Sequence, residues 1–184
     1  EMWQAILLSA TVVVAVLSPF LWYGTLSDVY EMYLDVPQIH QWLTGCAHNI
    51  WWLIAPVPPF VSDRMTFLPG INGLRIGLSS FALTCVLVAI SILNRHTLRQ
   101  LAHGAAFLAF AFFMVVTQIH ENHLYACFPF LAIAATEDRR LVRIFAVLTL
   151  TFAADMVLTL YLLYTDVPVM LGPIRLSLVS AAIN

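Results

Sequence analysis

Long runs of apolar residues alternate with short polar links along most of the chain. A run of about 18 apolar residues or more is long enough, as an α-helix, to cross a bilayer core of about 30 Å. The pattern predicts five transmembrane helices, the fourth of them short, over residues 3–22, 74–93, 101–117, 124–136 and 141–164. The final stretch "PVMLGPIRLSLVSAAIN" resembles the start of a truncated sixth segment. We therefore expect an all-α, polytopic transmembrane bundle, with residues 1–184 forming one transmembrane domain.

Residues 24–73 form the one long link between the expected spans. This link carries acidic residues among aromatic ones, followed by a stretch with two adjacent tryptophans and three prolines, "TGCAHNIWWLIAPVPPF". Tryptophan rings favour the membrane interface. Irregular backbone at that depth is tolerated only where it lines a cavity in the protein. We expect one or two helices here that lie along the outer leaflet or dip into it.

Composition agrees with a membrane protein and excludes other classes. The chain is 61% hydrophobic and 10% charged, whereas soluble domains carry about 25% charged residues. A net charge of −2 gives no reason to expect nucleic acid as a partner. The three cysteines show no CxxC spacing and are expected to pack as small apolar residues. The first ten residues lack the basic region of a cleaved signal peptide.

The arginines are distributed unevenly and predict an orientation. All eight cations are arginines, and five of them lie in the short links 94–100 and 137–143. The positive-inside rule places both links in the cytoplasm. The N-terminus is then cytoplasmic, and residues 24–73 and the stretch "QIHENH" (118–123) lie on the outer face.

The stretch "QIHENH" admits three interpretations. His120 and His123 are three residues apart and can share a helix face, but zinc proteases space their histidines four apart and zinc sites usually need a third ligand. No metal site is expected for that reason. A hydrated turn is the second interpretation, although such turns favour Gly, Asn, Ser and Pro. In the third, His120, Glu121 and His123 bind a phosphate or a sugar at the membrane surface.

Two further charged residues are candidates. Asp155 lies inside the fifth expected span, where an acidic residue costs about 2.5–3.5 kcal/mol on insertion scales; we expect it to face other helices, as a structural or a functional group. Arg64 is the best placed outer cation, because a guanidinium can bind phosphate in a bidentate manner. A solvated surface charge is the alternative interpretation of Arg64.

An ordered set of motifs resembles the C-terminal half of bacterial GT-C membrane glycosyltransferases. The motifs are "PFLWYG", "HQWLTGCAHNIWWLI" with its N-x-W, an outer arginine, and "HENHLYACFPFLAIA". This family includes mannosyltransferases related to the enzymes that build GPI anchors. The resemblance implies transfer of a sugar from a polyprenyl-phosphate donor at the outer face of a bacterial inner membrane, with no cofactor beyond that donor. His120 and Glu121 match the family's His-Glu, and Asn49 and Trp51 match its N-x-W.

Two departures from the family leave the activity open. The basic residue that follows His-Glu in the family is Asn122 here, and the family's catalytic acid belongs to an early outer loop with no counterpart in these residues. No catalytic residue is therefore assigned. The alternative is a noncatalytic membrane subunit derived from such an enzyme, which implies other membrane subunits as partners. A third hypothesis, an ion transporter using Asp155 and the histidines, lacks the inverted repeat of that class.

Overall fold

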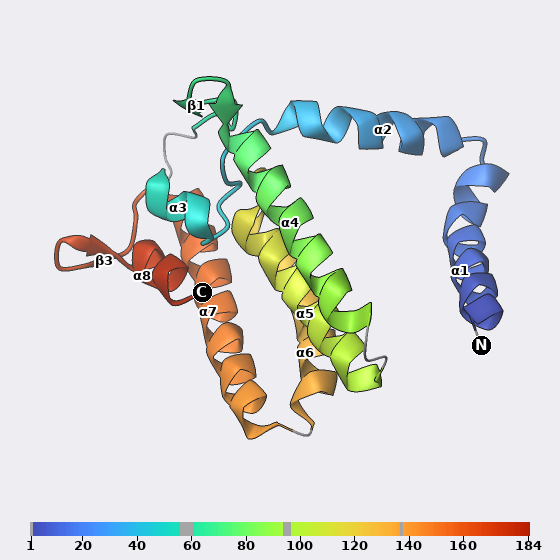
Figure 1. The fold of residues 1–184 in the computed structure, drawn as a ribbon. Coiled ribbons are helices and arrows are strands. Elements are labelled where there is room, and N and C mark those ends of the chain that lie inside the picture. Colours follow the sequence, from blue (N-terminus) through green and yellow to red (C-terminus); the bar gives the residue numbers. More distant parts are fainter. Residues whose placement is uncertain (1, 56–60, 94–96, 137) are drawn as a thin grey trace. The chain divides into compact units, whose positions relative to one another are not determined.

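The computed structural model describes residues 2–55, 61–93, 97–136 and 138–184, and most of them are helical (Figure 1). The chain divides into two compact units, Glu1–His40 and Gln41–Asn184.

The first unit consists of two helices, α1 (Met2–Trp22) and α2 (Leu26–Ile39). Their axes are bent by 112° between Ala10–Trp22 and Leu26–Met32. Gly24 lies at the bend with φ of +70°, a conformation that glycine adopts without steric cost. The expected first span, 3–22, is thus helical, and within the described residues its part Ala10–Trp22 counts as a candidate span together with Leu26–Met32, as a bent pair.

The second unit contains three helices long and apolar enough to cross a membrane. They are α4 (Gly73–Leu93), α5 (Leu98–Val115) and α7 (Arg139–Thr165). Within the described residues the number of such helices is three, or four if the bent pair counts as one. The expectation of about five spans is therefore not confirmed, although the coarser prediction of a helical membrane protein is.

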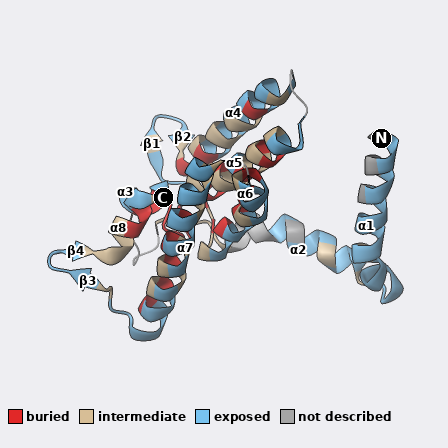
Figure 2. Ribbon diagram, turned by 90° about the horizontal axis from the view of Figure 1, so that it is seen from below, coloured by how far each residue is buried: buried red, intermediate tan, exposed pale blue. Residues whose placement is uncertain are grey.

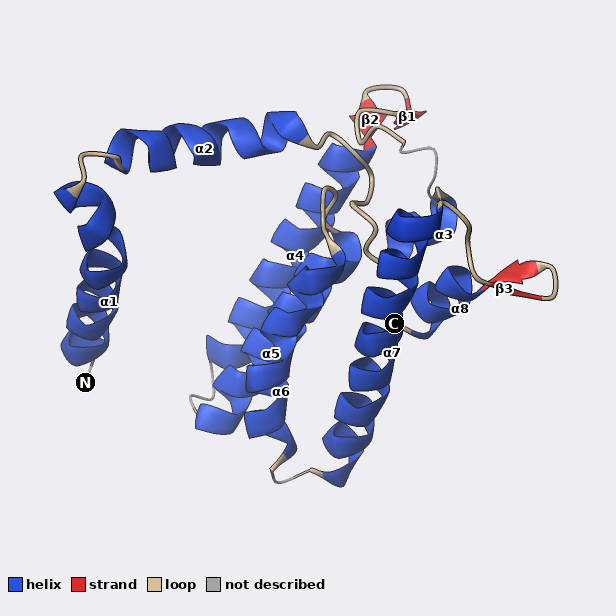
Figure 3. Ribbon diagram, turned by 180° about the vertical axis from the view of Figure 1, so that it is seen from behind, coloured by secondary structure: helices blue, strands red, loops and turns tan. Residues whose placement is uncertain are grey.

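The expected fourth span, 124–136, is replaced by two short elements. A 3₁₀ helix, η1 (Glu121–Ala126), leads into α6 (Cys127–Ala135). Nine α-helical residues rise about 14 Å, which is half of a bilayer core. The two elements nevertheless return the chain alongside α5 before α7 begins (Figures 1 and 3). Arg99 and Asp138, from the two arginine-bearing links, consequently meet in an ion pair of 3.6 Å.

Two short hairpins depart from the all-α expectation. β1 (Thr66–Leu68) pairs with β2 (Ile71–Asn72) immediately before α4, and β3 (Met170–Leu171) pairs with β4 (Ile174–Arg175) before α8 (Leu176–Ile183). Gly70 and Gly172 turn these hairpins with positive φ. The chain's last helix, α8, packs on α7 and on the short helix α3 (Ile50–Ile54).

The core lies between α5, α6 and α7, and the outer faces of the helices remain apolar and exposed (Figure 2). Phe113, Leu124 and Leu131 are among its buried side chains. Leucine, valine and isoleucine side chains on α4 are more than half exposed, as expected for a surface that faces lipid: Leu78, Leu83, Val86, Leu87 and Ile90.

Candidate functional site

A buried stretch of extended chain, residues 43–49, connects the polar motifs of this protein. All seven residues are buried, although the stretch includes Thr44, His48 and Asn49. Backbone hydrogen bonds fix it on two sides, from the N–H of Leu43 to the carbonyl of Val61 at 2.8 Å and from Gly45 to Ile119 at 2.8 Å. The N-x-W segment and the His-Glu segment are therefore packed against each other.

Asn49 and Trp51 join this stretch to the end of α5. The Asn49 side-chain oxygen accepts the backbone N–H groups of Trp51 and Trp52, at 3.1 and 3.3 Å, and so caps α3. Its amide nitrogen donates to the carbonyl of Phe113 at 3.0 Å, while the Trp51 indole donates to Val115 at 2.9 Å. Both acceptors belong to the last turn of α5, whose carbonyls have no partner within the helix. The N-x-W motif thus has a positioning role in this fold, and contact of these two residues with a substrate remains a prediction.

Asp155 is fully buried in α7 and faces the same stretch rather than the membrane. One carboxylate oxygen accepts the backbone N–H of His48 at 3.2 Å, and the other lies 3.4 Å from the imidazole Nδ1 of His48. The Thr159 hydroxyl lies 3.3 Å from Asp155 and from the Cys46 carbonyl and can donate to either. Asn184 donates to the His48 carbonyl at 3.1 Å. This cluster joins α7, the buried stretch and the end of α8.

A second buried acid, Asp63, was not predicted from the sequence, in which its neighbour Arg64 was the candidate. Asp63 has no exposed surface, and its carboxylate accepts hydrogen bonds from Gln118 at 2.6 Å and Thr117 at 3.4 Å. Its backbone also bonds to Gln41 and Leu74. The Arg64 side chain is exposed beside it. The two neighbouring residues differ in burial. The sequence of this loop has no hydrophobic periodicity from which that burial could be predicted.

The His-Glu motif forms the polar edge of this assembly. The imidazole of His120 lies directly over Gly45, where a Cβ atom would be 2.9 Å from the ring. The rings of His120 and His123 are stacked, with centroids 6.0 Å apart and planes 23° apart. The backbone N–H of His120 donates to Nδ1 of His123 at 3.2 Å. Glu121 is half-buried, whereas His123 is exposed, so one histidine is packed and the other remains accessible to a ligand.

Left-handed backbone flanks this contact on both sides. Cys46 has φ of +72° and Gln118 has φ of +64°, values that cost energy for residues other than glycine. Gln118 is held by its backbone N–H, which donates to the Trp42 carbonyl at 3.0 Å, and by its side chain on Asp63. Such backbone strain concentrates at functional sites.

A cavity of about 500 Å³ adjoins the exposed histidine. Its walls come from α4, α5 and the η1 helix: Phe81, Leu108, Ala109, Phe112, Asn122, His123, Tyr125 and Ala126. The Phe81 and Phe112 rings meet edge to face at 5.4 Å, and the Phe112 and His123 rings lie 6.2 Å apart. The cavity is therefore apolar along α4 and α5 and polar where it reaches the His-Glu motif.

Burial determines the protonation of two groups in the buried stretch. Burial lowers the pKa of His48 to about 4. Burial, together with the carboxylates of Glu121 and Asp155, raises the pKa of the Cys46 thiol to about 11. His48 is therefore neutral and Cys46 remains a thiol at neutral pH, which makes Cys46 a poor nucleophile.

The structure thus brings together His120, His123, Asn49 and Trp51 at one end of the helices, with Asp63 and His48 as supports. No three His, Cys, Asp or Glu side chains converge as a metal-binding group within the described parts of the chain. Comparison with known protein families, with curated proteins and with solved structures finds no match in any of the three.

Proposed function

We propose that this chain binds a polyprenyl-phosphate-linked sugar at the outer face of a bacterial inner membrane, as part of a membrane glycosyltransferase. The observation that supports it best is the cavity of about 500 Å³, whose wall is apolar along α4 and α5 and includes His123 and Asn122 at its other side. A polyprenyl-phosphate sugar likewise has an apolar part and a polar part, since its long apolar chain is attached to a charged phosphate. The ordered motifs of the sequence point to the same ligand class.

Each part of the cavity has a role in this proposal. Phe81, Leu108 and Phe112 bind the first isoprene units by apolar contact. His123 donates a hydrogen bond to the phosphate, and Glu121, which precedes the lining residue Asn122 in the chain, accepts one from a sugar hydroxyl. His120 is a positioning residue, because its ring stacks on His123 and lies over Gly45. No catalytic base and no cofactor is assigned.

Photocrosslinking with a short, photoreactive polyprenyl-phosphate sugar in membranes containing the protein tests the proposal. Leu108→Trp, which fills the cavity, and His123→Ala, which removes the donor, should each reduce crosslinking at least fivefold. Leu83→Trp is the matched control, because Leu83 is 59% exposed on α4 and lies outside the cavity. Crosslinking that stays at the wild-type level in both cavity variants would contradict the proposal.

A noncatalytic subunit is the second candidate. It is favoured by the polar atoms of Asn49, Trp51 and Asp155, which make packing hydrogen bonds and do not belong to the lining of the cavity. In that case His123→Ala and Glu121→Ala should leave the abundance of the whole complex and its sugar-transfer activity unchanged. A loss of transfer at normal abundance would instead support the glycosyltransferase.

A further inference from the structure

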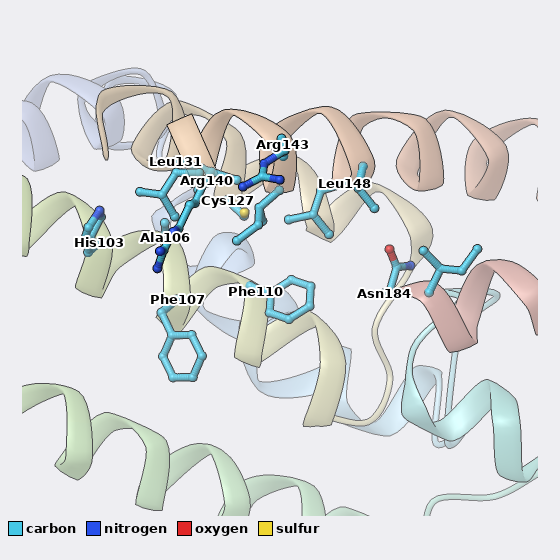
Figure 4. A pocket seen from close by; sticks show the side chains of 14 residues that line it. His103, Ala106, Phe107, Phe110, Cys127, Leu131, Arg140, Arg143, Leu148 and Asn184 are labelled. Atoms are coloured by element: carbon cyan, nitrogen blue, oxygen red, sulfur yellow. The ribbon is translucent and has the colours of Figure 1, made fainter. Parts of the chain in front are cut away.

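A second, larger cavity of about 800 Å³ lies between α5, α6 and α7, within the unit Gln41–Asn184 (Figure 4). Most of its wall is apolar, with Phe107 and Phe110 from α5, Leu131 from α6 and Leu148 from α7. Along α7 the lining extends from residue 140 to residue 148, a rise of about 12 Å. This shape suits a single hydrocarbon chain running along the helices.

One end of this cavity is basic. Arg140 and Arg143 line it from the first turns of α7, and His103 lines it from α5; Figure 4 shows His103 and Arg140 towards one end and Asn184 towards the other. Neither guanidinium has an ion pair or hydrogen bond with a described residue. Asp138, an acid near these arginines, instead pairs with Arg99 at 3.6 Å and accepts the backbone N–H of Arg140 at 2.8 Å.

His103 supplies a second, independent observation. Its Nε2 atom is buried and has no hydrogen-bond partner among the residues that the structure describes. A buried polar atom without a partner costs free energy. An acceptor placed at this end of the cavity would remove that cost.

We propose that this cavity binds an anionic glycerophospholipid, with one acyl chain along α5 and α7 and its phosphate on Arg140 and Arg143. The arginine distribution predicts that this end faces the cytoplasm. Anionic lipids are abundant in that leaflet, and basic pockets between transmembrane helices there bind lipid headgroups. Guanidinium groups hold phosphate by paired, charge-assisted hydrogen bonds. This site lies at the opposite end of the helices from the His-Glu motif and does not depend on the proposed glycosyltransferase function.

An apolar protein segment is the competing occupant. Such a segment would fill the hydrocarbon wall but would provide no anion for the two guanidiniums or for His103. A neutral phospholipid such as phosphatidylcholine would fill the wall equally well, but its choline group would offset the attraction of its phosphate. Charge complementarity therefore favours the anionic lipid.

The test measures lipid binding to the purified full chain with bromine-labelled phosphatidylglycerol or phosphatidylcholine, read out by retention of lipid in native mass spectra. We expect at least a tenfold preference for phosphatidylglycerol. Arg140→Gln combined with Arg143→Gln should reduce that preference to less than twofold. Arg139→Gln, which removes a charge from the same exposed turn but lies outside the cavity lining, should leave it within twofold of wild type.

A second pair of variants tests the acyl site without removing charge. Ile144→Trp adds bulk at the rim of the cavity, where Ile144 is 47% exposed, and should lower phosphatidylglycerol retention at least fivefold. Val142→Trp, 51% exposed on the same helix and outside the lining, is its control. Equal retention of the two lipids by wild type, or equal losses in Arg139→Gln and the double variant, would overturn the proposal. A photoreactive residue at Phe107 that crosslinks to protein rather than lipid in native membranes would also overturn it.

Discussion

At the scale of single residues, buried polar side chains of this apolar chain form hydrogen bonds between segments that are far apart in sequence. Asn49 caps the start of α3 by accepting two backbone N–H groups, and it also caps the end of α5 by donating to the carbonyl of Phe113. Trp51 adds a second bond to the same turn of α5. Without these side chains the last carbonyls of α5 would be buried without partners, which costs free energy.

Asn49→Ala should therefore lower the free energy of unfolding by about 1–3 kcal/mol, the range for losing a cap and leaving a buried carbonyl unpaired. The change is measured as a lower apparent Tm of the purified protein in detergent, followed by tryptophan fluorescence. Ile54→Ala is the control, because Ile54 belongs to the same short helix and is 53% exposed. An Asn49→Ala protein as stable as this control would show that the capping bonds contribute nothing.

The stability of the fold should depend on pH through His48. Burial lowers the pKa of this imidazole from 6.5 to about 4. At pH values between 4 and 6.5, His48 is therefore protonated in the unfolded chain but neutral in the folded chain. The contribution of His48 to stability is then fully present above pH 6.5 and is lost as the pH falls towards 4. At about 1.4 kcal/mol per pKa unit, the loss is on the order of 3 kcal/mol.

Apparent Tm values recorded between pH 7.5 and 4.5 check this expectation. His48→Gln retains a polar side chain but has no imidazole to protonate, so the Tm of wild type should fall relative to that of His48→Gln as the pH is lowered. His123→Gln is the control, since His123 is exposed at the edge of the site. The same slope in wild type and His48→Gln would assign the pH dependence to another group.

At the scale of helices and strands, hydropathy predicts the long elements well. The expected spans 74–93, 101–117 and 141–164 coincide closely with α4, α5 and α7, because continuous apolar runs need no information from distant residues. The hairpins and the 3₁₀ helix depend on tertiary contacts, so the hydropathy pattern does not predict them. The same holds for the site. The His-Glu and N-x-W motifs can be recognised in the sequence, whereas the hydrogen bond from Asn49 to Phe113 joins residues 64 positions apart and cannot be predicted from local sequence.

Helices α4 and α5 approach closely at small residues, as membrane helices commonly do. A Cβ atom at Gly77 would lie 2.6 Å from the backbone carbonyl of Val115, and one at Gly104 would lie 2.6 Å from the tip of the Ile92 side chain. The two contact distances are equal, but the backbone of Val115 cannot move aside easily, whereas the Ile92 side chain can change rotamer. We expect Gly77→Ala to destabilise the fold by about 1–3 kcal/mol and Gly104→Ala by less. Thermal unfolding of both variants in the same detergent decides this, and equal losses would contradict it.

At the scale of the whole molecule, the two polar ends of the unit Gln41–Asn184 differ in charge and chemistry. One end carries the links with Arg99, Arg140 and Arg143, and the other carries the buried stretch, Asp63 and the His-Glu motif. The proposed sugar-donor cavity includes His123 from the histidine end, and the proposed phospholipid cavity includes Arg140 and Arg143 from the arginine end. Both proposals therefore require the arginine end to face the cytoplasm.

Single-cysteine labelling in intact cells tests this orientation. Cys46, Cys85 and Cys127 would first be replaced by alanine, and one cysteine would then be introduced at Asn122→Cys or at Thr97→Cys, both of which are exposed. The positive-inside rule places the arginine-bearing links in the cytoplasm. A membrane-impermeant maleimide should therefore label position 122 in intact cells and position 97 only after lysis. The reverse pattern would invert the topology and place the His-Glu motif in the cytoplasm, where the extracytoplasmic sugar transfer proposed here could not occur. Labelling of both positions from outside would instead show that α5, which lies between them in the chain, does not place them on opposite sides of the bilayer.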